Sequence, residues 1–117
     1  MNQQSDSPVD IKHLHQISQG DVEFEIEVLQ VYLEDNLQKI EKIREAIADE
    51  HPVEIMHEAH YIKGASGNVG ARQMQKLATE LEDISQSQNS DLLLTIVDNM
   101  LIALKSIELF IEGLATK

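Results

Sequence analysis

Residues 21–48 read DVEFEIEVLQVYLEDNLQKIEKIREAIA, and this run indicates a helical fold. Its apolar residues recur in steps of three and four, which places them on one face of an α-helix; they are Ile26, Leu29, Leu33, Leu37, Ile40, Ile43 and Ile47. Residues 22–28 also alternate between apolar and acidic side chains, as in a β-strand. Because the three-and-four spacing continues beyond residue 28, the sequence predicts one long helix. Phe24, Val28 and Val31 widen its apolar face, which we expect to accept a short helix at residues 10–18.

Residues typical of helix ends support three further long helices. Asp21 is expected to cap the helix described above. Pro52 is a favoured first-turn residue and starts the next helix, which Gly70 ends or bends. Another helix carries the apolar residues from Met74 to Ile84. Ser90 is expected to cap the last helix, which continues to Leu114.

These helices share one property, an apolar stripe that needs a partner. The expected core residues are Ile11, Leu14 and Ile17 in the first helix, Ile55, Ala59, Ile62, Ser66 and Val69 after Pro52, Met74, Leu77, Ala78, Leu81 and Ile84 in the next, and Leu93, Val97, Met100, Leu104, Ile107, Ile111 and Leu114 in the last. The sequence therefore predicts an all-α fold, an antiparallel up-down four-helix bundle with a short N-terminal cover helix. We expect residues 9–117 to form this one domain and residues 1–8 to be a disordered lead-in.

Composition excludes several classes of function. The chain has no cysteine, which excludes disulfides, thiolate metal sites and cysteine nucleophiles. Nine basic residues face 21 acidic ones, and the resulting formal charge of −12 makes nucleic acid and anionic membranes poor partners. Charged residues interrupt the apolar residues of the last helix, so no membrane insertion is expected. The polar start of the chain lacks the regions of a signal peptide. We expect a cytoplasmic monomer.

The candidate chemistry lies in HEAHYIKGASGNVGA, residues 57–71. On a helix with about 100° per residue, His60 lies about 140° from the centre of the core stripe and faces solvent. Lys63 and Gly64 follow one turn later on the same surface. A histidine in water is mostly neutral at pH 7, so its free ring nitrogen can attack phosphorus. Gly64 and Gly67 each cost the exposed helix roughly 1 kcal/mol relative to Ala, which favours a role in letting another protein approach.

The segment Ala59–Ala71 strongly resembles the histidine-containing phosphotransfer (HPt) domains of bacterial multistep phosphorelays. The family pattern is Ala-His, an apolar residue two positions later, Lys-Gly, small residues, and an apolar residue before Gly-Ala, and this segment fits it throughout. Gly20–Asp21 and the later Leu77, Leu81 and Glu82 also fit, so the resemblance covers about Val9 to Leu114. It implies a four-helix bundle with the phosphoacceptor exposed on one helix.

The resemblance also implies roles for individual residues. His60 corresponds to the phosphoacceptor, Lys63 to the lysine that assists phosphate, and Gly64 to the glycine that leaves room for the partner. Glu82 corresponds to a Gln or Glu that hydrogen-bonds the histidine; its carboxylate would hold the Nδ1–H tautomer but would also repel phosphate. Docking is expected on the exposed strip of the helix that carries His60, together with neighbouring faces of the helices at residues 10–18, 21–48 and 74–84. The nearest candidates for partner contact are Met56, His57, Gly67 and Asn68.

The sequence therefore predicts a phosphoryl carrier rather than an enzyme, which accepts the group from one receiver aspartate and passes it to another. The expected partners are response-regulator receiver domains and a hybrid histidine kinase. No cofactor is expected in the chain, and the receiver should supply Mg²⁺.

Two alternatives remain at the level of sequence. One is a helical bundle that binds receivers without phosphotransfer. The other is a metal-binding bundle, although no metal site is predicted. His57-Glu58-Ala59-His60 is one residue short of the zincin motif. Glu54-x-x-His57 is half of a di-iron motif whose second copy the sequence lacks.

Overall fold

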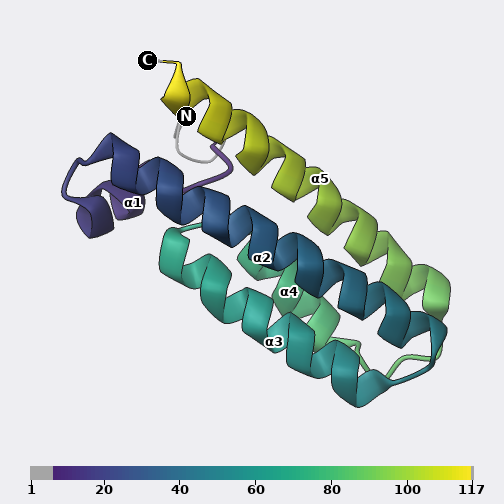
Figure 1. Ribbon diagram of the computed structural model, residues 1–117. Coiled ribbons are helices and arrows are strands. Elements are labelled where there is room, and N and C mark those ends of the chain that lie inside the picture. The colour runs from purple at the N-terminus through teal and green to yellow at the C-terminus, as the bar shows by residue number, and fades with distance from the viewer. Residues whose placement is uncertain (1–6, 117) are drawn as a thin grey trace.

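The computed structural model describes residues 7–116, and all of the regular structure in that range is helical. The helices are α1 (Ile11–Ser18), α2 (Val22–Ala48), α3 (Pro52–Val69), α4 (Arg72–Asp83) and α5 (Ser90–Ala115) (Figure 1). Most of the expected lead-in, residues 1–6, lies outside the described residues. Val9 is completely buried, so the chain joins the core directly after Pro8.

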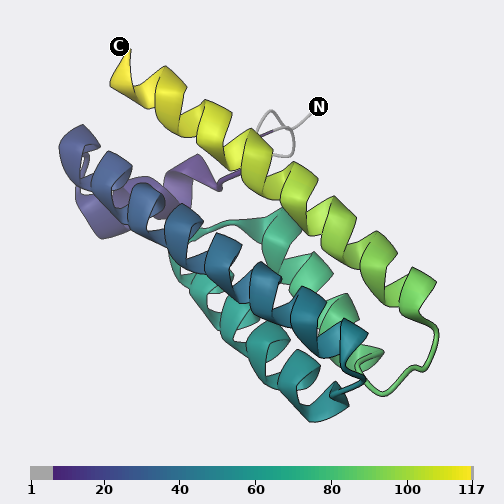
Figure 2. The ribbon, with the colours of Figure 1, turned by 45° about the vertical axis from the view of Figure 1, so that its right-hand side comes forward.

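The four long helices form a bundle in which each packs against two others. Helix α2 lies against α3 and α5, and α4 lies against the same two helices. Successive long helices run in opposite directions in both views of the ribbon (Figures 1 and 2). Helix α1 packs on α2. The predicted four-helix bundle with an N-terminal helix is thereby confirmed. No helix within residues 7–116 has the length and apolar character needed to cross a lipid bilayer.

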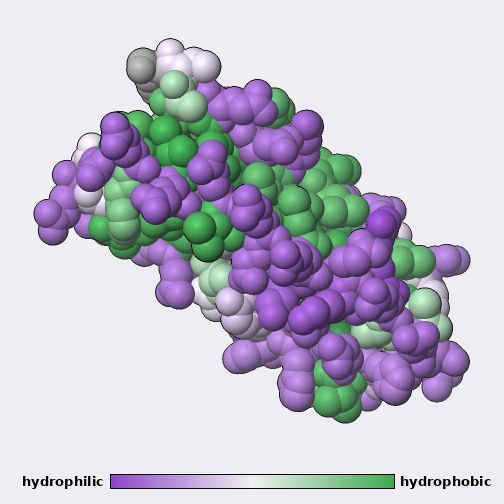
Figure 3. Space-filling view, in the orientation of Figure 1, coloured by the Kyte–Doolittle hydropathy of each residue, from purple (hydrophilic) through white to green (hydrophobic). Residues whose placement is uncertain are grey.

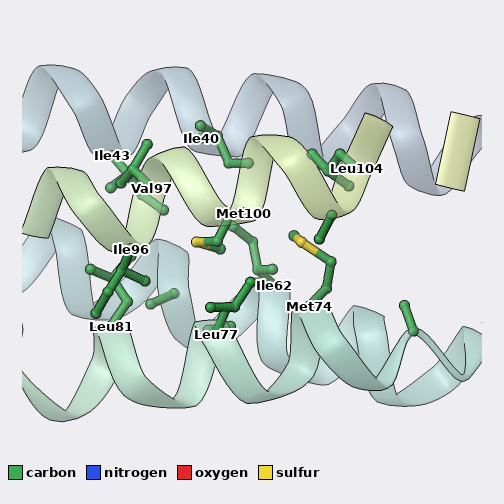
Figure 4. Packing of buried hydrophobic residues seen from close by; sticks show 14 of the residues in the cluster. Ile40, Ile43, Ile62, Met74, Leu77, Leu81, Ile96, Val97, Met100 and Leu104 are labelled. Carbon is green, nitrogen blue, oxygen red and sulfur yellow. The ribbon is translucent and has the colours of Figure 1, made fainter. Parts of the chain in front are cut away.

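The predicted core is confirmed most completely in α3 and α4. All five residues expected to be buried in α3 are buried, from Ile55 to Val69. In α4 the four residues from Met74 to Leu81 are buried, and Ile84 is half-buried just beyond the helix. The cluster shown in Figure 4 joins α2, α3, α4 and α5; its labelled residues are Ile40, Ile43, Ile62, Met74, Leu77, Leu81, Ile96, Val97, Met100 and Leu104. The face of α3 opposite this core is consequently left to solvent, and the surface over the middle of α3 is largely hydrophilic (Figure 3).

The buried face of α2 differs from the predicted stripe. Leu37, expected in the core, is exposed, whereas the polar residues Tyr32 and Asn36 are buried. The Tyr32 hydroxyl shares a hydrogen bond of 2.6 Å with the Ser66 hydroxyl of α3. Asn36 Nδ2 donates to the Tyr32 carbonyl at 2.7 Å. These bonds satisfy the two hydroxyls and the Asn36 amide nitrogen, while the buried Asn36 Oδ1 has no hydrogen-bond partner among the described residues. A search for apolar residues alone therefore overlooks this face.

The cover helix α1 is held differently from the expectation. Only Leu14 of its three apolar residues is buried, and Ile11 and Ile17 are exposed. Phe24 and Val31 of α2 are exposed as well, so α1 does not cover them as predicted. Polar contacts replace the expected apolar ones, because a helix of eight residues offers little apolar area.

The polar contacts of α1 lie at both of its ends. At its start, the Asp10 side chain caps the helix by accepting from the His13 amide at 3.2 Å. The Asp10 amide donates to the Gly70 carbonyl at 2.7 Å, which ties the chain to the turn between α3 and α4. At its end, His15 Nδ1 lies 2.6 Å from a carboxylate oxygen of the buried Glu25. The cover helix is therefore fixed to both α2 and the α3–α4 turn.

The helix ends follow the sequence signals with one exception. Asp21 caps α2 by accepting from the Phe24 amide, and Pro52 opens α3. Gly70 ends α3 with a φ of 81°, a left-handed conformation that favours glycine. The cap of α5 is Asn89, not Ser90, because the Asn89 side chain accepts from the Leu92 amide at 3.2 Å.

Candidate functional site

His60 lies near the middle of α3 on the face turned away from the core. Its side chain is 68% exposed, whereas its neighbours Ala59 and Ile62 are completely buried. The ring lines a shallow surface depression together with Met56, His57, Tyr61 and Glu82. The predicted exposure of the imidazole is confirmed, and another protein can reach it.

Glu82 of α4 orients the His60 ring. Its Oε2 atom lies 2.9 Å from His60 Nδ1. A carboxylate only accepts hydrogen bonds, so this contact places the proton of a neutral imidazole on Nδ1. The lone pair of Nε2 is then left for chemistry. Helices α3 and α4 pack closely along their lengths, which fixes the two side chains relative to each other.

Lys63 binds the other oxygen of the same carboxylate. Lys63 Nζ donates to Glu82 Oε1 at 2.7 Å. This hydrogen bond is the largest influence on Glu82 and holds the pKa of its carboxyl below the ordinary value; the bond from His60 acts in the same direction and burial opposes both. Glu82 is therefore an anion at neutral pH, shared between an imidazole and an ammonium group.

The two glycines that follow His60 on α3, Gly64 and Gly67, have different surroundings. A Cβ atom built on Gly64 meets nothing within 4 Å, so no contact inside the described chain requires glycine there. A Cβ atom on Gly67 lies 3.1 Å from Gln75 Nε2 of α4. The side chain of Gln75 thus packs over Gly67, which gives that glycine a structural reason.

The remaining predicted contact residues surround His60 on α3. Met56 is half-buried and His57 is exposed, and both line the depression. Asn68 is exposed one turn beyond Gly64, and its carbonyl accepts a hydrogen bond from His13 Nε2 at 2.9 Å. Helix α1 therefore lies beside the C-terminal end of α3.

A second polar cluster flanks His60 on the side of α2. Lys39 Nζ lies 4.4 Å from the centroid of the Tyr61 ring and 3.5 Å from Glu58 Oε1. Tyr61 is half exposed, and its hydrogen bond to the Asp35 carboxylate raises the pKa of its hydroxyl. Sequence reasoning missed this cluster. Tyr61 is next to His60 in the motif, but Lys39 and Asp35 belong to α2, and the predicted stripe of α2 did not identify the face that meets α3.

The sequence profile of the Hpt domain matches residues 27–114, well over half of the chain. The chain belongs to the Hpt domain family. It is therefore a histidine phosphotransfer protein of the kind that acts in phosphorelays, where Hpt domains carry phosphoryl groups and work with receiver domains and hybrid kinases. No curated protein sequence matches it closely enough to count as a relative.

Solved structures of Hpt proteins share the fold of this Hpt domain. HptB, a histidine-containing phosphotransfer protein of Pseudomonas aeruginosa PAO1, gives a TM-score of 0.81 at 17% sequence identity. The alignment covers 91% of this chain and 92% of the HptB chain. The Hpt domain of a sensor hybrid histidine kinase from Shewanella gives a TM-score of 0.70 at 19% sequence identity, and the alignment covers 93% of this chain and 94% of the Shewanella domain. At these identities the likeness concerns the fold.

The described residues give no support to the metal-binding alternative. Within residues 7–116, no group of three or more His, Cys, Asp or Glu side chains is placed to hold a metal ion. The Hpt assignment rests on the match of the family profile to residues 27–114.

Proposed function

We propose that His60 is the phosphoacceptor of this Hpt domain and that Nε2 is the atom that bonds phosphorus. The observation that carries the proposal is the hydrogen bond of 2.9 Å between His60 Nδ1 and Glu82. It assigns the proton to Nδ1 on a ring whose side chain is 68% exposed. An exposed nucleophilic nitrogen in a fixed orientation is what in-line phosphoryl transfer requires.

The transfer runs between His60 and an aspartate of a receiver domain. Nε2 attacks the phosphorus of the aspartyl phosphate, the phosphorus–oxygen bond breaks, and the aspartate leaves as a carboxylate. A second receiver reverses the step with its own aspartate. Lys63 attracts the phosphoryl oxygens from one turn along α3. The receiver supplies Mg²⁺ in this proposal, and the chain acts as a carrier without a kinase or nucleotide site of its own.

We propose that the receiver docks on the exposed strip of α3 and the adjoining side of α2. The strip contains Met56, His57, Gly64, Gly67 and Asn68. Lys39 and Tyr32 identify the side of α2 that meets α3. At about 100° per residue, Val28, Phe24 and Val31 lie about 40° to 100° around α2 from Tyr32, on the flank of that side. Phe24 and Val31 are exposed apolar residues, which suits a small, transient interface with a partner.

Phosphorylation of a histidine variant tests the proposal. His60→Gln should stay folded, because its side chain is exposed, yet should take up no phosphoryl group from a phosphorylated receiver. His51→Gln is the matched control, since His51 is also exposed but lies in the turn before α3. Radiolabelled phosphate measures uptake. Normal uptake by His60→Gln would remove the proposed role.

The runner-up function is a bundle that binds receivers without accepting phosphate. The same experiment separates the two, because such a module would bind a receiver while the unaltered chain stays unphosphorylated. The cytoplasmic location and the monomeric state remain predictions.

A further inference from the structure

We propose that Glu82 keeps a proton on Nδ1 of His60 throughout the phosphorylation cycle, so that the phosphorylated residue is a phosphoimidazolium with a neutral imidazole as its leaving group. The inference rests on the proposed role of His60. It assigns Glu82 as a positioning residue that acts through the ring, and it concerns the phosphorylated state.

The geometry around Nδ1 carries the inference. Glu82 Oε2 lies 2.9 Å from Nδ1, and Lys63 occupies Oε1 at 2.7 Å. The Glu82 side chain is only 22% exposed, so packing holds it at the ring. An ionised acceptor in this position favours a donor opposite it, and Nδ1 is a donor only while it carries its proton.

The charges of the transfer balance without any proton movement. Nε2 gives its lone pair to phosphorus, the aspartate departs with the electrons of the broken phosphorus–oxygen bond, and the ring becomes a cation that retains Nδ1–H. Glu82 stabilises this cation as the aspartate of a Ser-His-Asp triad stabilises its imidazolium, without taking the proton. When the next aspartate attacks, the nitrogen–phosphorus bond breaks and the neutral ring of the starting state returns.

A ring that lost the Nδ1 proton after phosphorylation would behave differently. The group leaving phosphorus would then be an imidazolide anion, which is far more basic than imidazole and a poorer leaving group. Glu82 therefore keeps the phosphoryl group transferable at pH values where a phosphohistidine in water loses the proton. The phosphorylated protein therefore transfers its phosphoryl group more readily and retains it for a shorter time.

Other titratable groups also surround the ring. His57 and Tyr61 of α3 line the same depression, and Lys63 pairs with Glu82. From α2, Lys39 lies over the Tyr61 ring, with Asp35 hydrogen-bonded to Tyr61 and Glu58 of α3 paired with Lys39. Glu82 supplies the contact to Nδ1 itself, so changing Glu82 alters the Nδ1 environment directly.

Nitrogen NMR of the phosphorylated protein tests the inference. The full chain, labelled with ¹⁵N-histidine, is phosphorylated by phosphoramidate and observed between about pH 6 and 9. We expect a phosphorus-coupled Nε2 and a protonated Nδ1 on His60 at about pH 8. In Glu82→Gln, which keeps the shape but not the charge, Nδ1 should lose its proton at least about one pH unit lower, a tenfold change in the proton affinity.

The rate of transfer to a receiver gives a second readout. When the pH is raised from about 6.5 to 8.5, the transfer rate of Glu82→Gln should fall about tenfold more than the transfer rate of the unaltered chain. Asp83→Asn removes the same charge from the exposed neighbouring position of α4 and should behave as the unaltered chain. A structural role for Glu82 alone would change the rate equally at every pH.

The possible results are distinguishable. An unprotonated Nδ1 in the phosphorylated, unaltered chain at about pH 8 would overturn the inference and leave the acceptor role of His60 intact, and this measurement does not need the variant to fold. Identical pH profiles for Glu82→Gln and the unaltered chain would overturn it as well. The absence of any phosphorus–nitrogen bond on His60 would overturn both the inference and the proposed function.

Discussion

A single carboxylate, that of Glu82, engages both His60 and Lys63. Because Glu82 holds Lys63 at 2.7 Å, the ammonium group is not free to meet a phosphoryl group until it changes partner. The two attractions compete, and the more highly charged phosphoryl group is the stronger of the two acceptors. Lys63 is therefore expected to contribute during transfer, when phosphate reaches the ring.

Removal of the Lys63 ammonium should slow transfer without unfolding the bundle. Lys63→Ala is expected to lower the transfer rate from a phosphorylated receiver by about tenfold, which corresponds to about 1.4 kcal/mol of transition-state stabilisation. Rapid-quench kinetics measure the rate and circular dichroism checks the fold. Lys105→Ala is the control, since Lys105 also donates to a carboxylate at 2.7 Å but lies on α5. An unchanged rate would leave Lys63 as an ordinary surface charge.

At the scale of elements, α3 combines a packed face with a face that sacrifices helix stability. Gly64 sits in the middle of the helix, and an added Cβ would meet open space. Glycine lowers helix stability by roughly 1 kcal/mol relative to Ala. Since no contact in the described chain requires glycine there, we expect the benefit to lie with a partner that approaches His60 closely.

Gly64→Ala should therefore separate stability from function. We expect the free energy of unfolding to rise by up to about 1 kcal/mol, while the rate of transfer falls because the methyl group obstructs the receiver. Urea denaturation and transfer kinetics measure the two effects. Gly113→Ala on α5 also adds a methyl group in open space and should leave transfer unchanged. A Gly64→Ala protein that transfers normally would contradict the proposed docking surface.

The elements themselves were largely predictable from sequence. Pro52, Gly70 and Asp21 each mark a helix end by local chemistry, and the regular apolar steps of α3 gave both its core and the exposure of His60. The register of α2 was not predictable, because two polar side chains on its buried face are held by hydrogen bonds: Tyr32 bonds Ser66 of another helix, and Asn36 donates to the Tyr32 carbonyl. The Lys39–Tyr61 contact was missed for the same reason.

At the scale of the whole molecule, the core contains a titratable group that links stability to alkaline pH. Burial raises the pKa of the Tyr32 hydroxyl to about 12, with Ser66 acting in the opposite direction, from an ordinary value of 10.0. A raised pKa in the folded state means that the neutral hydroxyl stabilises the fold below about pH 10. This stabilisation is lost as the pH rises from about 10 towards 12.

A phenylalanine variant tests this link. At neutral pH, Tyr32→Phe should destabilise the bundle by about 1 kcal/mol, because the Ser66 hydroxyl loses its partner. Above about pH 10 the difference in unfolding free energy between the two proteins should shrink, because only the unaltered chain loses stability as the tyrosine ionises in the unfolded state. Chemical denaturation at several pH values measures the difference, and lysine titration affects both proteins alike. A constant difference across that range would contradict the prediction.

The hydrogen bond from the Asp10 amide to the Gly70 carbonyl has a consequence for anyone shortening this chain. Gly70 lies in the turn between the two helices that carry His60 and Glu82, about 15 Å along α3 from the imidazole. Trimming the chain back to Ile11 would leave the imidazole and its carboxylate in place, yet would remove the hydrogen bond that joins the start of the chain to the turn between those helices. A truncation far from the imidazole would thus loosen the anchoring of the turn that joins its helix to that of its carboxylate.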